Sequence, residues 1–276
     1  MKDLLQWTEG SDSNFSERSV LAFDLDDTLT IEGELKSQVL ATLENAQKAG
    51  WITILVTGRS AGWVDALIKL LPFDAIVGEN GALLSFWPKL RKNRKPREES
   101  LKLFWTPQGY VSVAPQGMKE KHESASRQIL QKFPRTRIAS DQPFRMYDLA
   151  IDFAEEVNPP LDFETAEKIK DEFERLGAVA KVSSIHVNGW WGQFTKEQGL
   201  REVLEKYYKK SLDTHLIYVG DSPNDGPLFK VAGVSVGVAN IRHFVGKSQF
   251  QLPLFVTKLE GGYGAIEVIE KCLARR

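Results

Sequence analysis

Short apolar runs alternate with segments of helical periodicity at both ends of this 276-residue chain. The runs are residues 20–23, 52–56, 75–77, 216–219 and 234–238. Between the first two, Leu40, Leu43 and Ala46 recur at helical spacing, and Gly50 ends that segment. Strands that alternate with helices predict a parallel sheet covered by helices on both faces, so the expected fold class is α/β with a Rossmann-like core.

The middle of the chain, from about Phe86 to Trp191, has a different pattern. Helical segments near 119–133 and 163–176 are combined with an apolar run at 149–153 and with alternating residues over 178–187. This α+β pattern predicts a second domain inserted into the core. The expected organisation is an N-terminal extension over 1–18, a core over 19–85 and 193–276, and an inserted domain over 86–192.

The composition excludes several classes of protein. Hydrophobic residues are 42% and charged residues 26% of the chain, as in ordinary globular proteins, and the net charge of -1 favours neither nucleic acid nor anionic membrane. Cys272 is the single cysteine, so neither an internal disulfide nor a cysteine-rich zinc site can form. Residues 1–18 lack a signal-peptide pattern, and no apolar stretch approaches a membrane span. We therefore expect a cytoplasmic protein; its oligomeric state is left open.

Three carboxylates, Asp24, Asp26 and Asp27, follow the first apolar run. Close carboxylates repel one another, and a cation that prefers oxygen ligands, such as Mg²⁺, offsets that repulsion. Ligands of parallel sheets bind at the carboxyl ends of the strands. Aspartate is also common in turns and caps, so the position directly after an apolar strand is what favours a functional site.

Two further motifs also follow apolar runs. Thr57-Gly58-Arg59 offers a hydroxyl and backbone donors to a phosphate, although a plain strand-to-helix turn fits this motif as well. Gly220-Asp221-Ser222-Pro223-Asn224-Asp225 again places carboxylates after a strand, with helix capping as the alternative. Lys196, taken alone, reads as a surface lysine.

The order of these residues is more specific than any one motif. The series is Asp24, Asp26, Thr57, Lys196, Asp221 and Asp225. It resembles the motif series of the haloacid dehalogenase-like superfamily, and it frames nearly the whole chain. The resemblance implies a phosphatase in which Asp24 is the nucleophile that takes the phosphoryl group. It implies that Asp26 is the general acid/base, which protonates the leaving oxygen and then activates water.

The same resemblance implies Mg²⁺ as cofactor. The carboxylates of Asp24 and Asp221 and the backbone carbonyl of Asp26 are the expected ligands. Thr57, Gly58 and Lys196 are the expected phosphate-binding residues, and Asn224 and Asp225 are expected to support the metal site. The chemistry agrees with these roles, because a phosphate dianion repels an anionic nucleophile until cations and backbone donors neutralise its charge.

The inserted segment lies where this superfamily carries its C2 cap. Gly78-Glu79-Asn80-Gly81-Ala82 resembles the Asn-Gly-Ala loop of the Cof-like type IIB branch, which includes several sugar-phosphate phosphatases. One position departs from that branch: Glu197 follows Lys196, where glycine is common. Lys181 is therefore the alternative for the phosphate-binding lysine.

Substrate choice is expected to depend on the cap, because the core motifs recognise only the phosphoryl group and the metal. The candidates are polar or aromatic residues near the junction of cap and core. They are Glu79, Asn80, Arg145, His186, Asn188 and Trp190. For the tryptophan, stacking on a sugar and plain packing are equally compatible with the sequence.

The preferred function is hydrolysis of a small phosphorylated metabolite, with a sugar phosphate favoured. A phosphomutase or phosphotransferase that uses Asp24 but excludes water is one alternative, and a phosphate-responsive regulatory module is another. Asp26 disfavours the module, which needs no acid/base. The basic stretch Lys89–Arg97 is interpreted as a solvated loop, since it contains no aromatic residue to stack on bases. No nucleic-acid or membrane partner is expected.

Overall fold

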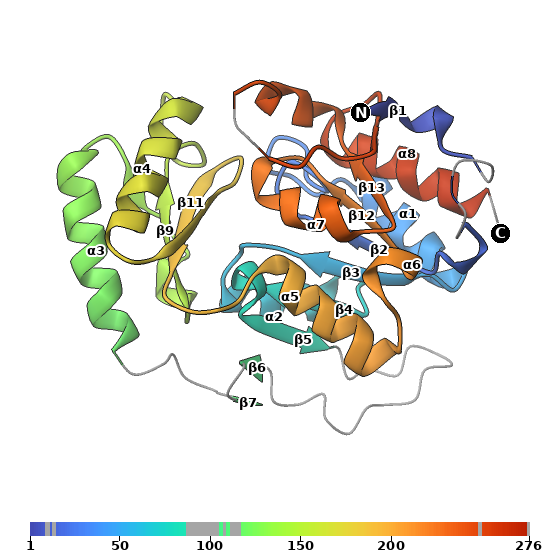
Figure 1. Cartoon of the computed structure of the whole chain (residues 1–276), viewed down its shortest axis with the longest axis horizontal. Helices are drawn as coiled ribbons and strands as arrows, with labels where there is room; N and C mark the ends of the chain where they lie inside the picture. The colour runs from blue at the N-terminus through green and yellow to red at the C-terminus, as the bar shows by residue number, and fades with distance from the viewer. Residues whose placement is uncertain are drawn as a thin grey trace.

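The computed structural model describes residues 1–8, 12, 15–86, 105–106, 109–110, 117–247 and 250–274. Its larger part is built on an eight-stranded sheet (Figure 1). In order across the sheet, the strands are β1 (Lys2–Asp3), β14 (Phe255–Val256), β13 (Val234–Gly237), β12 (Leu216–Gly220), β2 (Val20–Phe23), β3 (Ile52–Val56), β4 (Ala75–Gly78) and β5 (Leu83–Phe86). All neighbouring strands are parallel except β4 and β5. The α/β fold class is confirmed.

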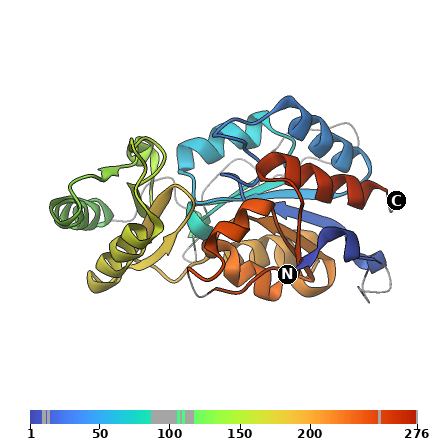
Figure 2. The same ribbon diagram turned by 90° about the horizontal axis from the view of Figure 1, so that it is seen from above.

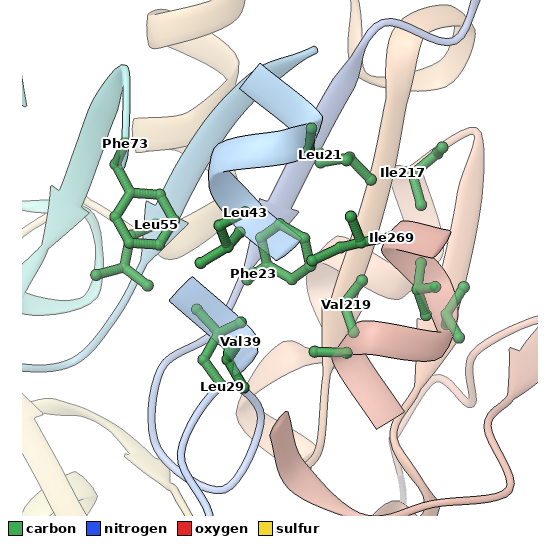
Figure 3. Close-up of a cluster of buried hydrophobic side chains, with 14 of the residues drawn as sticks. Leu21, Phe23, Leu29, Val39, Leu43, Leu55, Phe73, Ile217, Val219 and Ile269 are labelled. Atoms are coloured by element: carbon green, nitrogen blue, oxygen red, sulfur yellow. The ribbon is translucent and has the colours of Figure 1, made fainter. Parts of the chain in front are cut away.

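Helices cover both faces of this sheet, as Figure 2 shows from above. Leu21 and Phe23 of β2 face one hydrophobic cluster and Val20 and Ala22 face another, because successive side chains of a strand point to opposite faces. Helices α1 (Ser37–Lys48), α2 (Ala61–Leu70) and α8 (Gly261–Leu273) close the first cluster, part of which is drawn in Figure 3. The second is closed by α5 (Lys196–Glu202), the π-helix η6 (Val203–Tyr208), α6 (Leu212–His215) and α7 (Gly226–Val231).

The smaller part of the molecule has its own antiparallel sheet and its own hydrophobic cluster (Figure 1). In order across the sheet, its strands are β10 (Val179–Val182), β11 (His186–Trp190), β9 (Asp148–Asp152) and β8 (Arg137–Ile138). Helices α3 (Met118–Lys132) and α4 (Phe163–Arg175) contribute apolar side chains to this cluster, which includes Ile129, Ile151 and Phe173. We propose that this part is the cap predicted over 86–192.

Short elements complete the described chain. Strands β6 (Trp105–Thr106) and β7 (Gly109–Tyr110) pair with each other. The 3₁₀ helices are η1 (Leu4–Gln6), η3 (Phe15–Glu17), η4 (Glu79–Gly81), η5 (Gln142–Phe144), η7 (Pro223–Asp225) and η8 (Ala239–Phe244). Within the predicted N-terminal extension, β1 adds an edge strand to the core sheet beside β14. The basic stretch 89–97 lies outside the described residues. In the ranges that are described, no helix is long and apolar enough to span a membrane.

The strand order places the predicted motifs side by side. Strands β12, β2 and β3 are neighbours and parallel, so their carboxyl ends meet at one edge of the sheet. Asp221, Asp24 and Thr57 each follow one of these ends. Three loops that are far apart in sequence thereby form one site.

Candidate active site

Asp24, Asp221 and Asp225 form a buried cluster of carboxylates at this edge. One oxygen from each lies within 4.8 Å of the others, and all three residues are buried. Asp24 comes directly after β2 and Asp221 directly after β12, so the parallel pairing of these strands brings the two together. Asp225 follows within η7, where its side chain accepts the backbone N–H of Ser222 in a capping box.

Lys196 balances part of this negative charge. Its Nζ donates to Asp24 Oδ1 at 2.8 Å and to Asp225 Oδ1 at 3.0 Å. Burial alone would lower the pKa of Lys196, but the charges of Asp225 and Asp24 raise it well above its ordinary value. Of the two lysines considered for phosphate binding, Lys196 is the one that contacts Asp24, whereas Lys181 lies on β10 of the smaller part.

The loop of η4 packs against the start of α5, the helix that begins at Lys196. Thr195 caps α5 by accepting the N–H of Gln198. Gly81 has a φ of +109°, and a Cβ built there would lie 2.0 Å from the carbonyl oxygen of Thr195. Only glycine permits both the backbone conformation and the close approach. The Asn-Gly-Ala loop therefore positions Lys196, the residue expected to bind phosphate.

Asp225 is better placed to support the cluster than to coordinate an ion. Its Oδ1 accepts from Lys196 Nζ and, at 2.6 Å, from the hydroxyl of Tyr218. Its Oδ2 accepts the backbone N–H groups of Asp221 at 3.1 Å and Ser222 at 3.3 Å. Both oxygens are therefore occupied by four donors, which leaves Asp24 and Asp221 as the more available carboxylates.

The remaining oxygens fit a divalent cation. Asp221 Oδ1 accepts from Thr28 at 3.1 Å, whereas Oδ2 is buried without a hydrogen-bond partner in the described part of the chain. A buried carboxylate oxygen without a donor is costly unless a cation neutralises it. Burial, with the nearby charge of Asp24, raises the pKa of Asp221 well above its ordinary value. Burial raises the pKa of Asp24 to about 7 although Lys196 opposes this shift.

The Thr57-Gly58 turn lies beside the carboxylates. Thr57 is fully buried, its N–H donates to the carbonyl of Val77, and its hydroxyl oxygen accepts the N–H of Arg59 at 3.1 Å. Gly58 borders the cavity above Asp24. A Cβ at Gly58 would approach the side chain of Asn80 to 3.2 Å, so the loop of η4 packs closely on this turn.

Asp26 is held by a residue whose role the sequence did not reveal. Arg59 donates from Nη2 and Nε to the Asp26 carboxylate, at 2.7 and 3.0 Å, in a bidentate pair. Arg59 Nη2 also donates to Glu155 Oε1 of the smaller part at 2.6 Å. Burial alone would lower the pKa of Arg59, but Asp26 and Glu155 raise it well above its ordinary value.

Glu155 links Arg59 of the core to His186 of the cap. Its Oε2 lies 2.8 Å from His186 Nε2. Burial would raise the pKa of Glu155, but His186 and Arg59 together lower it to about 2. The series Asp26, Arg59, Glu155 and His186 therefore joins the expected acid/base to the cap. Arg59 adjoins the predicted Thr57-Gly58 motif and so carried a signal, whereas no local pattern singled out Glu155.

A small cavity of about 10 Å³ lies between the two parts, above Asp24 and Asp26. That volume holds about one water molecule. His186 and Asn188 line it from the cap, together with Ser183, so these two predicted residues do face the site. In this conformation the cap covers the expected nucleophile.

Other predicted specificity residues are engaged at the junction of the two parts. Glu79 accepts the backbone N–H groups of Ala61, Met146 and Tyr147 at 2.6–3.0 Å. Burial and the charge of Asp148 raise the pKa of Glu79 to about 8, while Arg145 and these N–H groups oppose the shift. The geometry favours an ionised carboxylate, since in the described part of the chain the hydrogen bonds of Glu79 all come from backbone N–H donors.

Arg145 and Asp148 form the other half of this junction. Arg145 donates to Asp148 Oδ1 at 2.9 Å, to both oxygens of Asp141, and to the carbonyl of Gly58 at 2.7 Å. Asp148 Oδ2 accepts from Asn80 at 3.0 Å and from Asn188 at 2.9 Å. These side chains hold the cap to the Thr57-Gly58 turn. For Glu79, Asn80 and Arg145, we propose this joining role in place of substrate contact.

Trp190 is packed and does not present a stacking face. Its side chain is almost fully buried, its ring is stacked on Phe194 with centroids 5.6 Å apart, and its Nε1 donates to the carbonyl of Phe194 at 3.1 Å. Of the two interpretations that the sequence allowed, the structure favours packing.

Comparison with known proteins identifies the family. A family model described as haloacid dehalogenase-like hydrolase matches residues 21–248. Because the match covers most of the chain, the protein belongs to this family of hydrolases. The prediction of an enzyme of the haloacid dehalogenase-like superfamily is confirmed.

Solved structures of similar fold come from several organisms. A haloacid dehalogenase-like hydrolase from Bacteroides thetaiotaomicron has a TM-score of 0.62 at 19% identity, covering 92% of this chain and 99% of its own. The sucrose-phosphatase of Synechocystis, solved with sucrose and phosphate, has a TM-score of 0.59 at 15% identity, covering 93% and 98%. A sugar phosphatase of haloacid dehalogenase subclass IIB has a TM-score of 0.60 at 15% identity, covering 92% and 98%.

Proposed function

We propose that this hydrolase is a Mg²⁺-dependent phosphatase that removes the phosphoryl group from a small metabolite, with a sugar phosphate as the favoured substrate. The observation that carries the proposal is the contact of Lys196 with Asp24 beside the unpartnered oxygen of Asp221. The cation of Lys196 thus contacts the proposed nucleophile Asp24, and a metal ion beside them would neutralise the remaining negative charge of Asp24 and Asp221. The sugar-phosphatase activity of proteins with the same fold agrees with this choice.

The proposed reaction has two displacements at phosphorus. In the first, a carboxylate oxygen of Asp24 attacks phosphorus, the bond to the leaving oxygen breaks, and Asp26 gives that oxygen a proton. In the second, water attacks the phosphorus of the aspartyl-phosphate and Asp26 takes its proton, which frees Asp24 and releases phosphate. Each step is easier than direct attack by water.

The chain's own residues prepare these steps. Lys196 would neutralise the phosphoryl oxygens as charge develops on them, and Arg59 fixes the direction of the Asp26 carboxylate. The proposed ligands of Mg²⁺ are the carboxylates of Asp24 and Asp221 and the backbone carbonyl of Asp26. When bound, the ion would stabilise negative charge on the phosphoryl group.

The cap must open for substrate to enter, since the cavity above Asp24 holds about one water molecule. The ion pair of Arg59 with Glu155 crosses the interface and would form again when the cap closes around the substrate, while Arg59 stays paired with Asp26 within the core. Closure excludes water that is not positioned to attack the phosphorus. His186 and Asn188 line the cavity from the cap, and we propose that they contact the substrate.

A screen of phosphorylated metabolites tests this proposal. Phosphate release is measured with Mg²⁺, with EDTA, and with Mg²⁺ restored after EDTA. We expect turnover of at least one sugar phosphate that depends on the metal. Transfer of the phosphoryl group to a second sugar without release of phosphate would instead support a mutase, and full activity after metal removal would contradict the site.

A further inference from the structure

A second cavity of about 260 Å³ adjoins the candidate active site. It lies between α4 and β10 of the cap and the segment of η7 and α7 in the core. Figure 1 shows the hairpin of β10 and β11 extending toward α7. Asn224 lines this cavity as well as the small cavity above Asp24, so both spaces border the same residue.

Lysines dominate the charge of this second cavity. Lys170, Lys181 and Lys230 line it from α4, β10 and α7, against the single carboxylate of Glu167. Glu167 pairs with Lys170 at 2.9 Å. Within the described residues, neither Lys181 nor Lys230 has an ion-pair partner. Two unpaired cations that face one cavity attract an anion into it.

A larger cavity that borders Asp221 does not have this excess of cationic side chains. It has a volume of about 850 Å³ and combines Arg242 and Lys258 with four carboxylates. These are Asp27, Glu32, Asp221 and Glu260. An anion is therefore favoured in the lysine-lined cavity and disfavoured in the larger one.

We propose that the cavity lined by Lys170, Lys181 and Lys230 binds a small anionic group, a carboxylate or a second phosphate, while the phosphoryl group occupies the site at Asp24. The proposal rests on the proposed phosphatase function and names its substrate class: a phosphomonoester that carries another negative charge. Because the lysines come from both the cap and the core, such a group would also favour the closed arrangement. The same chemistry could be supplied by a separate small anion.

Two esters that differ in one group provide the test. 3-Phosphoglycerate has a carboxylate where glycerol 3-phosphate has a hydroxymethyl group. Their kcat/KM values are measured for the native protein and for a Lys181→Ala/Lys230→Ala double variant. The matched control is Lys48→Ala/Lys168→Ala, which removes the same charge from exposed lysines paired with Glu44 and Glu164. Calorimetric binding of both esters and of succinate to proteins that also carry Asp24→Asn gives a readout without turnover.

We expect the double variant to lose about 10-fold in kcat/KM or affinity for 3-phosphoglycerate. Glycerol 3-phosphate should change less than 2-fold, and the control should change neither ester. Loss of succinate binding in the double variant, with the ester ratio unchanged, would assign the cavity to a separate anion. Equal effects on both esters, or no effect on any ligand, would overturn the proposal. If the metabolite screen finds no hydrolysed ester, the phosphatase proposal fails, and the calorimetry still decides whether the anion site exists.

Discussion

Glu155→Gln tests the contact through which Arg59, the partner of Asp26, is joined to the cap. The substitution keeps the shape of the side chain and removes its charge, so the ion pair with Arg59 and the carboxylate contact with His186 Nε2 are lost. The pKa of Glu155 falls from 4.5 to about 2 in the folded protein. A difference of that size corresponds to roughly 3 kcal/mol of preference for the charged form. Because 29% of the side chain is exposed, solvent screening reduces this to about 1–2 kcal/mol.

The expected loss depends on pH with a definite sign. A carboxylate with a lowered pKa stabilises the fold above its unfolded pKa, here about 4.5, and loses that contribution as pH falls toward about 2. Urea unfolding at pH 6, 5, 4 and 3 should therefore show a difference between native protein and variant that is largest at pH 6 and shrinks with acid. The variant should also have a lower kcat/KM, since Arg59 loses its contact with the cap.

Glu156→Gln is the matched control. Glu156 is the next residue, its side chain is 45% exposed, and it lies 3.6 Å from Arg137 in a surface ion pair. Such pairs contribute about 0–1 kcal/mol. Equal losses in both variants, or a loss in Glu155→Gln that does not change between pH 6 and pH 3, would rule out this role of Glu155.

Two further changes test the backbone and the metal site. Gly81→Ala should lower the free energy of unfolding by more than about 2 kcal/mol and reduce kcat, because it combines backbone strain at positive φ with a clash against Thr195. Gly177 also has a positive φ, +78°, but open space around it, so Gly177→Ala should lower the free energy of unfolding by only about 1 kcal/mol. Equal melting temperatures for the two variants would contradict this account. Mg²⁺ should raise the melting temperature of the native protein but not of Asp221→Asn, and in EDTA that variant should be at least as stable as the native protein, because Asp221 Oδ2 has no donor among the described residues. A similar Mg²⁺ effect in both proteins would remove Asp221 from the metal site.

The core and its motifs could be predicted because each depends on local order along the chain. Apolar runs such as 20–23 define strands, and the polar residue after each run lies at the carboxyl end of its strand. Parallel pairing of β12, β2 and β3 then brings Asp24 and Asp221 together without any further information. Lys196 required the motif order, since nothing in its immediate neighbours separates it from a surface lysine.

The cap interface could not be predicted in this way. Arg59 and Glu155 are 96 residues apart, and their contact exists only when the two parts dock. Arg145 was expected near the substrate because polar residues at a domain junction often bind ligands. In the structure Asp141 and Asp148 neutralise it, a pairing set by a tight turn and not by any periodic pattern.

The proposed mechanism requires that Asp24 carries the phosphoryl group during turnover. The direct measurement is a single turnover on the best substrate, quenched with acid and treated with borohydride, which reduces an acyl phosphate to an alcohol. Peptide mass spectrometry then reads residue 24. We expect homoserine at position 24 in the native protein and none in Asp24→Asn, which should also release no phosphate. Phosphate release by Asp24→Asn, or a reduced aspartate at another position, would contradict it.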